Sequence, residues 1–167
     1  MLLPLAARSQ TACPSPKAAI VSIETGTGNI SLNGTPIGAR ARGDYQPDSC
    51  SGHVAWVDIT GQIFKDAALL GAHAQTYVIN NNNLGIVFWT DNNGILHKDA
   101  TALGEPLGSF SVAVLTGDVA WVSNGDGHLH RNRDDLGAYQ GTFSITDDGR
   151  VSWTDPSNQR RVSPVNL

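Results

Sequence analysis

A short phrase recurs along this chain at a nearly constant spacing, and it constrains the fold more than any other feature. The phrase reads Gly-x-Val-x-Trp-x-Asp, then a tight turn, a second apolar stretch and a Leu-Gly pair, and it is clearest in residues 52–71. Its tryptophans are Trp56, Trp89, Trp121 and Trp153, spaced 33, 32 and 32 residues apart, and Ile23 stands 33 residues before the first. A repeat of this length decides the architecture, because each unit is one supersecondary element that buries its apolar faces against its neighbours.

The period divides the chain into five repeats within a single domain. Leu-Gly or Ile-Gly pairs close four of them, at Ile37-Gly38, Leu70-Gly71, Leu103-Gly104 and Leu136-Gly137. We therefore predict repeats at about 6–38, 39–71, 72–104, 105–137 and 138–167.

Each repeat is expected to hold three or four short antiparallel strands. The first strand carries an aromatic residue near its start, at Tyr45, Tyr77, Phe110 and Phe143. The second alternates, which places Val54 and Trp56 on one face and Ala55 and Val57 on the other. Both faces are apolar at the centre, so each sheet is expected to be covered on both sides. The Leu-Gly segment is either a fourth short strand or a loop.

The composition is typical of a turn-rich all-β fold. Hydrophobic residues make up 40% and charged residues 16%, with 18 glycines and 8 prolines. Small antiparallel sheets repeated around an axis form a β-propeller, and a closed ring leaves no exposed end sheets that would need a polar cap. We predict an all-β, five-bladed β-propeller with almost no helix. The main alternative, a β-prism or β-trefoil-like barrel, fits a count of five poorly.

Charge and hydropathy narrow the possible partners. The net charge is −4 and there is no basic stripe, so nucleic acid is not expected as a partner. No apolar run reaches the roughly 20 residues of a membrane span, so membrane insertion is not expected either. The apolar start MLLPLAA lacks the basic region of a signal peptide, which leaves a secreted and a cytoplasmic location both open. Cys13 and Cys50 form either a disulfide between the first two repeats or two buried thiols.

No pattern in the sequence indicates catalysis or a cofactor. There is no Gly-x-Ser-x-Gly elbow and no glycine-rich phosphate loop before a helix, so an enzyme is not expected. His128 and His130 alternate onto one face of a strand, but no third zinc ligand is evident from the sequence. The stretch 124–127, Asn-Gly-Asp-Gly, is similar to part of a calcium loop but lacks the full set of oxygen ligands at the required spacing. We therefore predict neither metal nor cofactor.

Residues 54–64, VAWVDITGQIF, carry a resemblance to a known family. The phrase Gly-x-Val-x-Trp-x-Asp-x-x-Gly-x-Ile resembles the repeat of tectonin-type β-propeller lectins, and the count of five resembles the lectins of the tachylectin-2 kind. The resemblance covers four repeats well. Trp56 stands one place later than in the usual tectonin order, and such lectins usually have six blades. The resemblance implies a propeller that binds glycans or glycoconjugates.

The predicted sites lie between adjacent blades, at the turn after the second strand. Their polar candidates are Asp58, Asp91, Asn93, His97, Asn124, Asp126, His130 and Asp155. Their aromatic candidates are Trp56, Trp89, Trp121 and Trp153, because sugars bind by stacking on aromatic rings while polar groups bond their hydroxyls. Each set has a structural alternative: Asp and Asn stabilise turns, the histidines can form a solvated outer edge, and tryptophans between valines are typical of a core.

These expectations lead to two hypotheses for function. The first is a multivalent carbohydrate-binding protein, a lectin, with equivalent sites between blades, acting as a monomer or small homo-oligomer. Near-identical repeats favour it, because several weak equivalent sites on one rigid body gain apparent affinity together. The second is a protein–protein interaction propeller with no sugar site, in which the tryptophans serve only the core.

Overall fold

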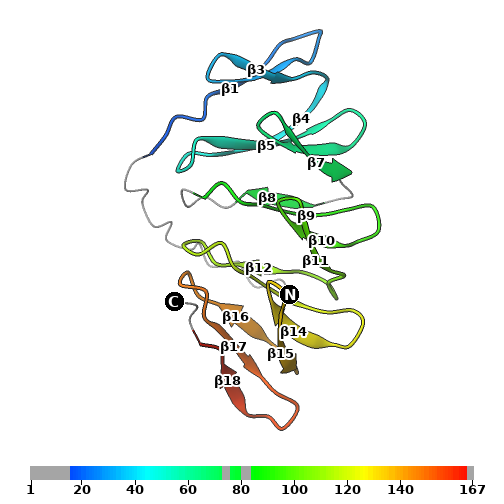
Figure 1. Ribbon diagram of the computed structural model, residues 1–167, viewed down its shortest axis with the longest axis vertical. Coiled ribbons are helices and arrows are strands. Elements are labelled where there is room, and N and C mark those ends of the chain that lie inside the picture. The colour runs from blue at the N-terminus through cyan, green and yellow to red at the C-terminus, as the bar shows by residue number, and fades with distance from the viewer. Residues whose placement is uncertain (1–15, 73–75, 80–83, 165–167) are drawn as a thin grey trace, which may run out of the picture.

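The computed structural model describes residues 16–72, 76–79 and 84–164. These residues form 18 strands, and no helix occurs among them. The strands make five separate antiparallel sheets, which follow one another along the long axis of the molecule (Figure 1). Within the described part of the chain there is accordingly no helix with the length and hydropathy of a membrane span.

Each sheet is built from consecutive strands of one repeat, and the strands lie side by side in chain order. The first sheet contains β1 (Val21–Ile23), β2 (Ile30–Leu32) and β3 (Thr35–Gly38). The second contains β4 (Ala41–Asp48), β5 (His53–Asp58), β6 (Gln62–Lys65) and β7 (Ala68–Ala72). The third contains β8 (Tyr77–Ile79), β9 (Val87–Thr90), β10 (Leu96–Lys98) and β11 (Thr101–Gly104). The fourth contains β12 (Ser111–Val112), β13 (Val119–Val122), β14 (His128–Arg131) and β15 (Asp134–Ala138). The fifth contains β16 (Phe143–Ile145), β17 (Val151–Thr154) and β18 (Arg160–Val162).

The Leu-Gly segments are strands. They form β3, β7, β11 and β15, and each pairs with the preceding strand across a register shift. The shift falls beside the residue that pairs with the glycine, as at Ile63, which faces Gly71. A β-bulge of this kind bends the strand locally.

The turn between the third and fourth strands has the same construction in successive sheets. Its first residue is Asp66, Asp99 or Asn132, each with a positive φ of about 50° that Asp and Asn tolerate better than most residues. The Oδ1 atom of Asp66 accepts a hydrogen bond from the amide of Val54, 2.9 Å away, and its carbonyl accepts one from Trp56 Nε1 at 2.7 Å. The turn thereby fixes the indole in the adjoining strand.

Four apolar cores separate the five sheets. In the core between the second and third sheets, Ala55, Val57 and Ile63 meet Val87 and Trp89. Equivalent residues build the other three cores. The alternation predicted for the second strand is therefore correct. Trp56, Trp89, Trp121 and Trp153 are core side chains with 1, 2, 3 and 9% of their surface exposed.

The described sheets form an open stack instead of the ring that we predicted. The first and fifth sheets lie at opposite ends of the molecule (Figure 1). Their outward faces also carry polar residues where the inner sheets have apolar ones, although Val162, the cross-strand partner of Ser152, is exposed on the fifth sheet. Arg160 is exposed at the position where the other sheets have a buried residue, namely Ile30, Ile63, Leu96 and Leu129. Beside it, Ser152 and Ser144 share a hydrogen bond of 2.9 Å.

The first sheet carries a similar polar face, and here the alignment of Ile23 with the tryptophans is wrong. Ser22 pairs with Ser31 in the register in which Trp56 pairs with Phe64. Ile23 instead pairs with Ile30 and contributes to the core with the second sheet. Two serines thus replace the tryptophan and its neighbour. Polar outer faces on terminal repeats are what an open stack requires.

Cys50 is buried and disulfide-bonded, and no free cysteine occurs among the described residues. The other cysteine of the chain, Cys13, lies outside these residues, as does the asparagine run 80–83.

Candidate functional site

The predicted aspartates of the turn after the second strand stabilise that turn. Asp91 Oδ1 accepts hydrogen bonds from the amides of Asn93 and Ile95, at 2.8 and 3.0 Å. Asp58 and Asp155 accept the equivalent pairs of amide bonds. One carboxylate oxygen in each of these turns is therefore committed to the backbone, as the structural alternative proposed.

The second carboxylate oxygen faces the third strand, and its partner differs between sheets. Asp91 Oδ2 lies 3.1 Å from Nε2 of His97, and Asp155 Oδ2 accepts a 2.7 Å bond from Nε of Arg161. Partial burial raises the pKa of Asp91, but the bonds from His97 and the two backbone amides outweigh it, so the pKa of this carboxyl is lowered. The amide of Gln159, and then Arg161, lower the pKa of Asp155. Both groups are therefore anionic at neutral pH.

A row of ring side chains crosses each of the inner sheets. Tyr77, Trp89 and His97 are cross-strand partners on β8, β9 and β10. The rings of Trp89 and His97 stack with centroids 4.1 Å apart, and Trp121 stacks on His130 at 4.7 Å. His97 and His130 are therefore covered by tryptophan instead of forming a solvated edge; 14 and 15% of their side chains are exposed.

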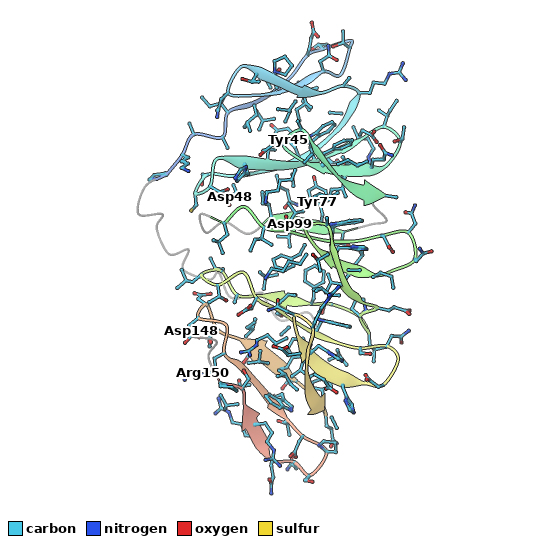
Figure 2. The ribbon with its side chains drawn as sticks, in the orientation of Figure 1. Tyr45, Asp48, Tyr77, Asp99, Asp148 and Arg150 are labelled. Atoms are coloured by element: carbon cyan, nitrogen blue, oxygen red, sulfur yellow. The ribbon has the colours of Figure 1, made fainter. Side chains whose placement is uncertain are left out.

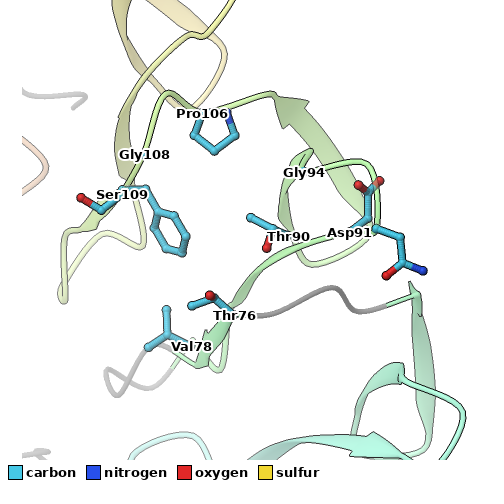
Figure 3. Close-up of a pocket in the computed structure, with 10 residues that line it drawn as sticks. Thr76, Val78, Thr90, Asp91, Gly94, Pro106, Gly108 and Ser109 are labelled. Carbon is cyan, nitrogen blue, oxygen red and sulfur yellow. The ribbon is translucent and has the colours of Figure 1, made fainter.

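A cleft of about 700 Å³ opens between the third and fourth sheets (Figure 3). Its floor comes from Thr76, Thr90 and Asp91 of the third sheet, and its opposite wall from Pro106 and Ser109. The other lining residues are Val78, Asn92, Gly94, Gly108 and Phe110. The cleft thus combines an aromatic and aliphatic wall with hydroxyl, amide and carboxylate groups.

The wall of this cleft is fixed to the fourth sheet by backbone bonds. The amide of Leu107 donates to the carbonyl of Val122 at 2.7 Å, and the amide of Asn124 donates to the carbonyl of Glu105 at 2.9 Å. The predicted site residue Asn124 also bonds Glu105 Oε1 through its side chain, at 2.8 Å. Asn124 therefore holds Glu105, the residue before Pro106 of the wall, and is not part of the lining itself.

A second cleft, of about 460 Å³, lies between the second and third sheets. Tyr45 and Tyr77, which lie on these successive sheets in Figure 2, line it together with Thr76. Arg42 also lines it, and its Nε and Nη2 atoms both donate to Oδ2 of Asp44, at 3.0 and 2.7 Å. Burial raises the pKa of Tyr77 to about 12, with a further increase from Asp44, so this phenol stays protonated and can donate a hydrogen bond.

The two clefts occupy equivalent places in the repeat. Each is bounded by a first-strand aromatic residue of the following sheet, Tyr77 in one and Phe110 in the other. The sequence analysis named these aromatics as strand markers and did not assign them to a site. The sequence could have pointed to these aromatics, because they recur with the same period as the tryptophans. They lie at the outer end of each ring row.

Most of the predicted site residues lie away from these clefts. Of the twelve, Asp91 lines the larger cleft, and Asn93 is exposed in the turn beside it. The four tryptophans lie in the cores. Asp126 and His130 gather elsewhere on the fourth sheet, with Asp126 Oδ1 3.9 Å from His130 Nε2.

The fourth sheet brings together carboxylate and imidazole side chains whose positions in the sequence follow no common spacing. His128 Nδ1 lies 2.9 Å from Asp135 Oδ2 and 4.0 Å from Asp126 Oδ2. The hydrogen bond that Asp135 accepts from His128 raises the pKa of His128 and lowers that of Asp135. A bond from the amide of His128 and one from Ser123 lower the pKa of Asp126.

No protein-family model matches this chain, and neither does any curated protein.

Proposed function

We propose that this protein is a carbohydrate-binding protein whose sugar sites are the two clefts between its second, third and fourth sheets. The observation that carries the proposal is the pairing in each cleft of a first-strand aromatic residue with fixed polar groups. In the larger cleft these are Phe110, Thr76, Thr90 and Asp91. Aromatic rings accept the C–H face of a sugar, while hydroxyl and carboxylate groups bond its hydroxyls.

The clefts would act together on one ligand or one glycan-bearing surface. They share Thr76 and are bounded by three successive sheets, which pack about 10 Å apart. Two weak sites at such a separation gain apparent affinity when a branched or repeating glycan occupies both. The resemblance of residues 54–64 to tectonin-type lectins agrees with this function.

A closed five-bladed ring is not needed for these sites. The sheets are antiparallel and consecutive, as propeller blades are, and each cleft requires only two neighbouring sheets. We place the proposed lectin on the open stack for this reason, and because both end faces are polar.

A glycan-array screen with the full chain, followed by calorimetry on each glycan that binds, tests the proposal. We expect two sites per chain. The variant Thr90→Trp fills the larger cleft, into which the side chain of Thr90 points (Figure 3), and should reduce the count to one. Ser157→Trp, in an exposed turn of the fifth sheet away from both clefts, is the matched control and should keep two.

The absence of glycan binding by protein with a native circular-dichroism spectrum would overturn the proposal. Capture of a single protein partner by such material would instead favour the protein–protein interaction hypothesis. Glycan binding that Thr90→Trp leaves unchanged would remove the larger cleft from the proposal.

A further inference from the structure

The fourth sheet holds a compact group of metal-binding side chains. One potential ligand atom from each of Asp126, His128 and Asp135 lies within 4.8 Å of the others. They come from three places: the turn before β14, β14 itself and β15. The carboxylate of Asp126 lies between the two imidazoles, 4.0 Å from His128 Nδ1 and 3.9 Å from His130 Nε2.

These residues differ from those at the equivalent positions of other repeats, and in the fourth sheet they lie close together. His128 stands where the second and fifth sheets have Gln62 and Gln159, and Asp135 pairs across the sheet as Leu69 does in the second. The turn that carries Asp126 is one residue longer than the equivalent turn of the second, third and fifth sheets, since the cross-strand partner of the tryptophan stands nine positions after it in the fourth sheet and eight in the others. Three separate differences of the fourth repeat therefore place their side chains in one group.

The imidazole of His130 supplies an independent observation. Its Nε2 atom is buried and has no hydrogen-bond partner among the described residues. A buried polar nitrogen without a partner is costly, and it is directed at a carboxylate that lies beyond hydrogen-bonding distance. A cation between His130 Nε2 and the carboxylate of Asp126 would be a ligand partner for both groups.

We propose that the fourth sheet binds one zinc ion through His128, Asp126 and Asp135, with His130 as the fourth ligand. Two imidazole nitrogens and two carboxylate oxygens are a donor set that zinc accepts, whereas calcium and magnesium prefer oxygen ligands alone. The ion replaces the proton shared by His128 and Asp135 and joins the turn, β14 and β15. This proposal is independent of the sugar sites.

Tag-free full-length protein tests it, first with Zn²⁺ by calorimetry and then with Co²⁺ by visible absorption. We expect one site per chain, a rise in Tm with Zn²⁺, and the absorption of tetrahedral Co²⁺. His128→Gln and Asp135→Leu restore residues that other sheets use at these positions, so they should fold, and each should weaken Zn²⁺ binding at least about tenfold.

His53→Gln is the matched control. His53 lies 2.5 Å from Asp66 and is partly exposed, so it is a second His–Asp pair, but it belongs to no group of three potential ligands among the residues described. This variant should bind Zn²⁺ as the unmodified chain does. The proposal is overturned if the unmodified chain binds no Zn²⁺, if the two consensus variants bind it unchanged, or if His53→Gln weakens binding as much as they do.

Discussion

Trp56 of the second sheet lies over Gly38 of the first so closely that a Cβ atom on Gly38 would stand 2.3 Å from Cη2 of the indole. The same contact joins Gly71 to Trp89 and Gly104 to Trp121. The closing glycines Gly38, Gly71 and Gly104 are therefore sockets for the tryptophan of the next repeat, whereas a Cβ atom on Gly137 would meet nothing within 4 Å. This contact explains why the glycine and the tryptophan keep the same period.

Gly38→Ala should destabilise the protein through this contact alone, since Gly38 does not have the positive φ that would strain alanine by itself. We expect a cost of about 1–3 kcal/mol, the usual range for overpacking a core. Chemical denaturation of Gly38→Ala, Trp56→Phe and the double variant measures it. The smaller ring relieves the clash, so the cycle should show a favourable coupling of at least about 0.5 kcal/mol. Gly125→Ala, whose Cβ would meet only Ser123 Oγ at 3.6 Å, is the control; strict additivity in the cycle would contradict the socket.

Asp99 makes the turn that fixes Trp89, and its substitution by Asn and by Ala should have different effects. Its φ is 49°, its Oδ1 accepts the amide of Val87 at 3.1 Å, and its carbonyl accepts Trp89 Nε1. Asn132 fills the same role in the fourth sheet, so Asp99→Asn should change the free energy of unfolding little. Asp99→Ala strains the left-handed residue and leaves a buried amide unpaired, at a cost of about 2–4 kcal/mol. Equal stability of the two variants in urea denaturation would show that the side chain plays no part.

The repeat predicted most of this fold because each of its periodic residues has a local physical role. The tryptophan row, the Asx turn and the glycine socket recur with the period, so the strand order and the four cores follow from it. The alternation of Val54 and Trp56 with Ala55 and Val57 predicted a strand covered on both faces, but it left the tryptophans as candidates for both the sugar sites and the core, and the structure places them in the core.

Predictions made from the constant spacing were wrong where a turn changes length. The turn between β1 and β2 of the first sheet is one residue longer than the turn between β5 and β6 of the second, counted between paired residues, so a constant spacing selects Ile23 where the register selects Ser22. With Ile23 in that place the polar face that carries Ser22 was not recognised, and the five sheets were predicted to close into a ring. The longer turn of the fourth repeat hid the meeting of Asp126 with His128 and His130 in the same way. Spacing alone does not show which side chains a turn brings together.

The polar face of the fifth sheet should keep the protein from associating end to end. Ser152 and Arg160 occupy the positions of Ala55 and Ile63 in the second sheet. The double variant Ser152→Ala, Arg160→Leu gives this outward face the pattern of an inner one, and exposed apolar patches promote association. Sedimentation velocity should show dimers or larger species at concentrations where the unmodified chain shows one.

Arg150→Leu is the control for that experiment, because it also removes an exposed arginine but lies outside the end face, beside Asp148. It should sediment as the unmodified chain does. If the double variant does not associate, the face is already covered in solution and the stack is not open there.

Tyr77 should make the stability of the protein fall above pH 10. Its pKa is about 12 in the folded protein, against 10.0 for a free side chain, because burial and Asp44 disfavour the phenolate. A raised folded pKa means that the unfolded state loses its proton first, so this contribution to stability is complete below pH 10 and is lost as the pH rises towards 12. Ultraviolet titration of tyrosinate and urea denaturation across this range measure the two effects. Tyr77→Phe should remove the titration step near pH 12 and flatten this part of the stability profile, whereas Tyr45→Phe should retain both; a step near pH 12 that persists in Tyr77→Phe would assign it to another residue.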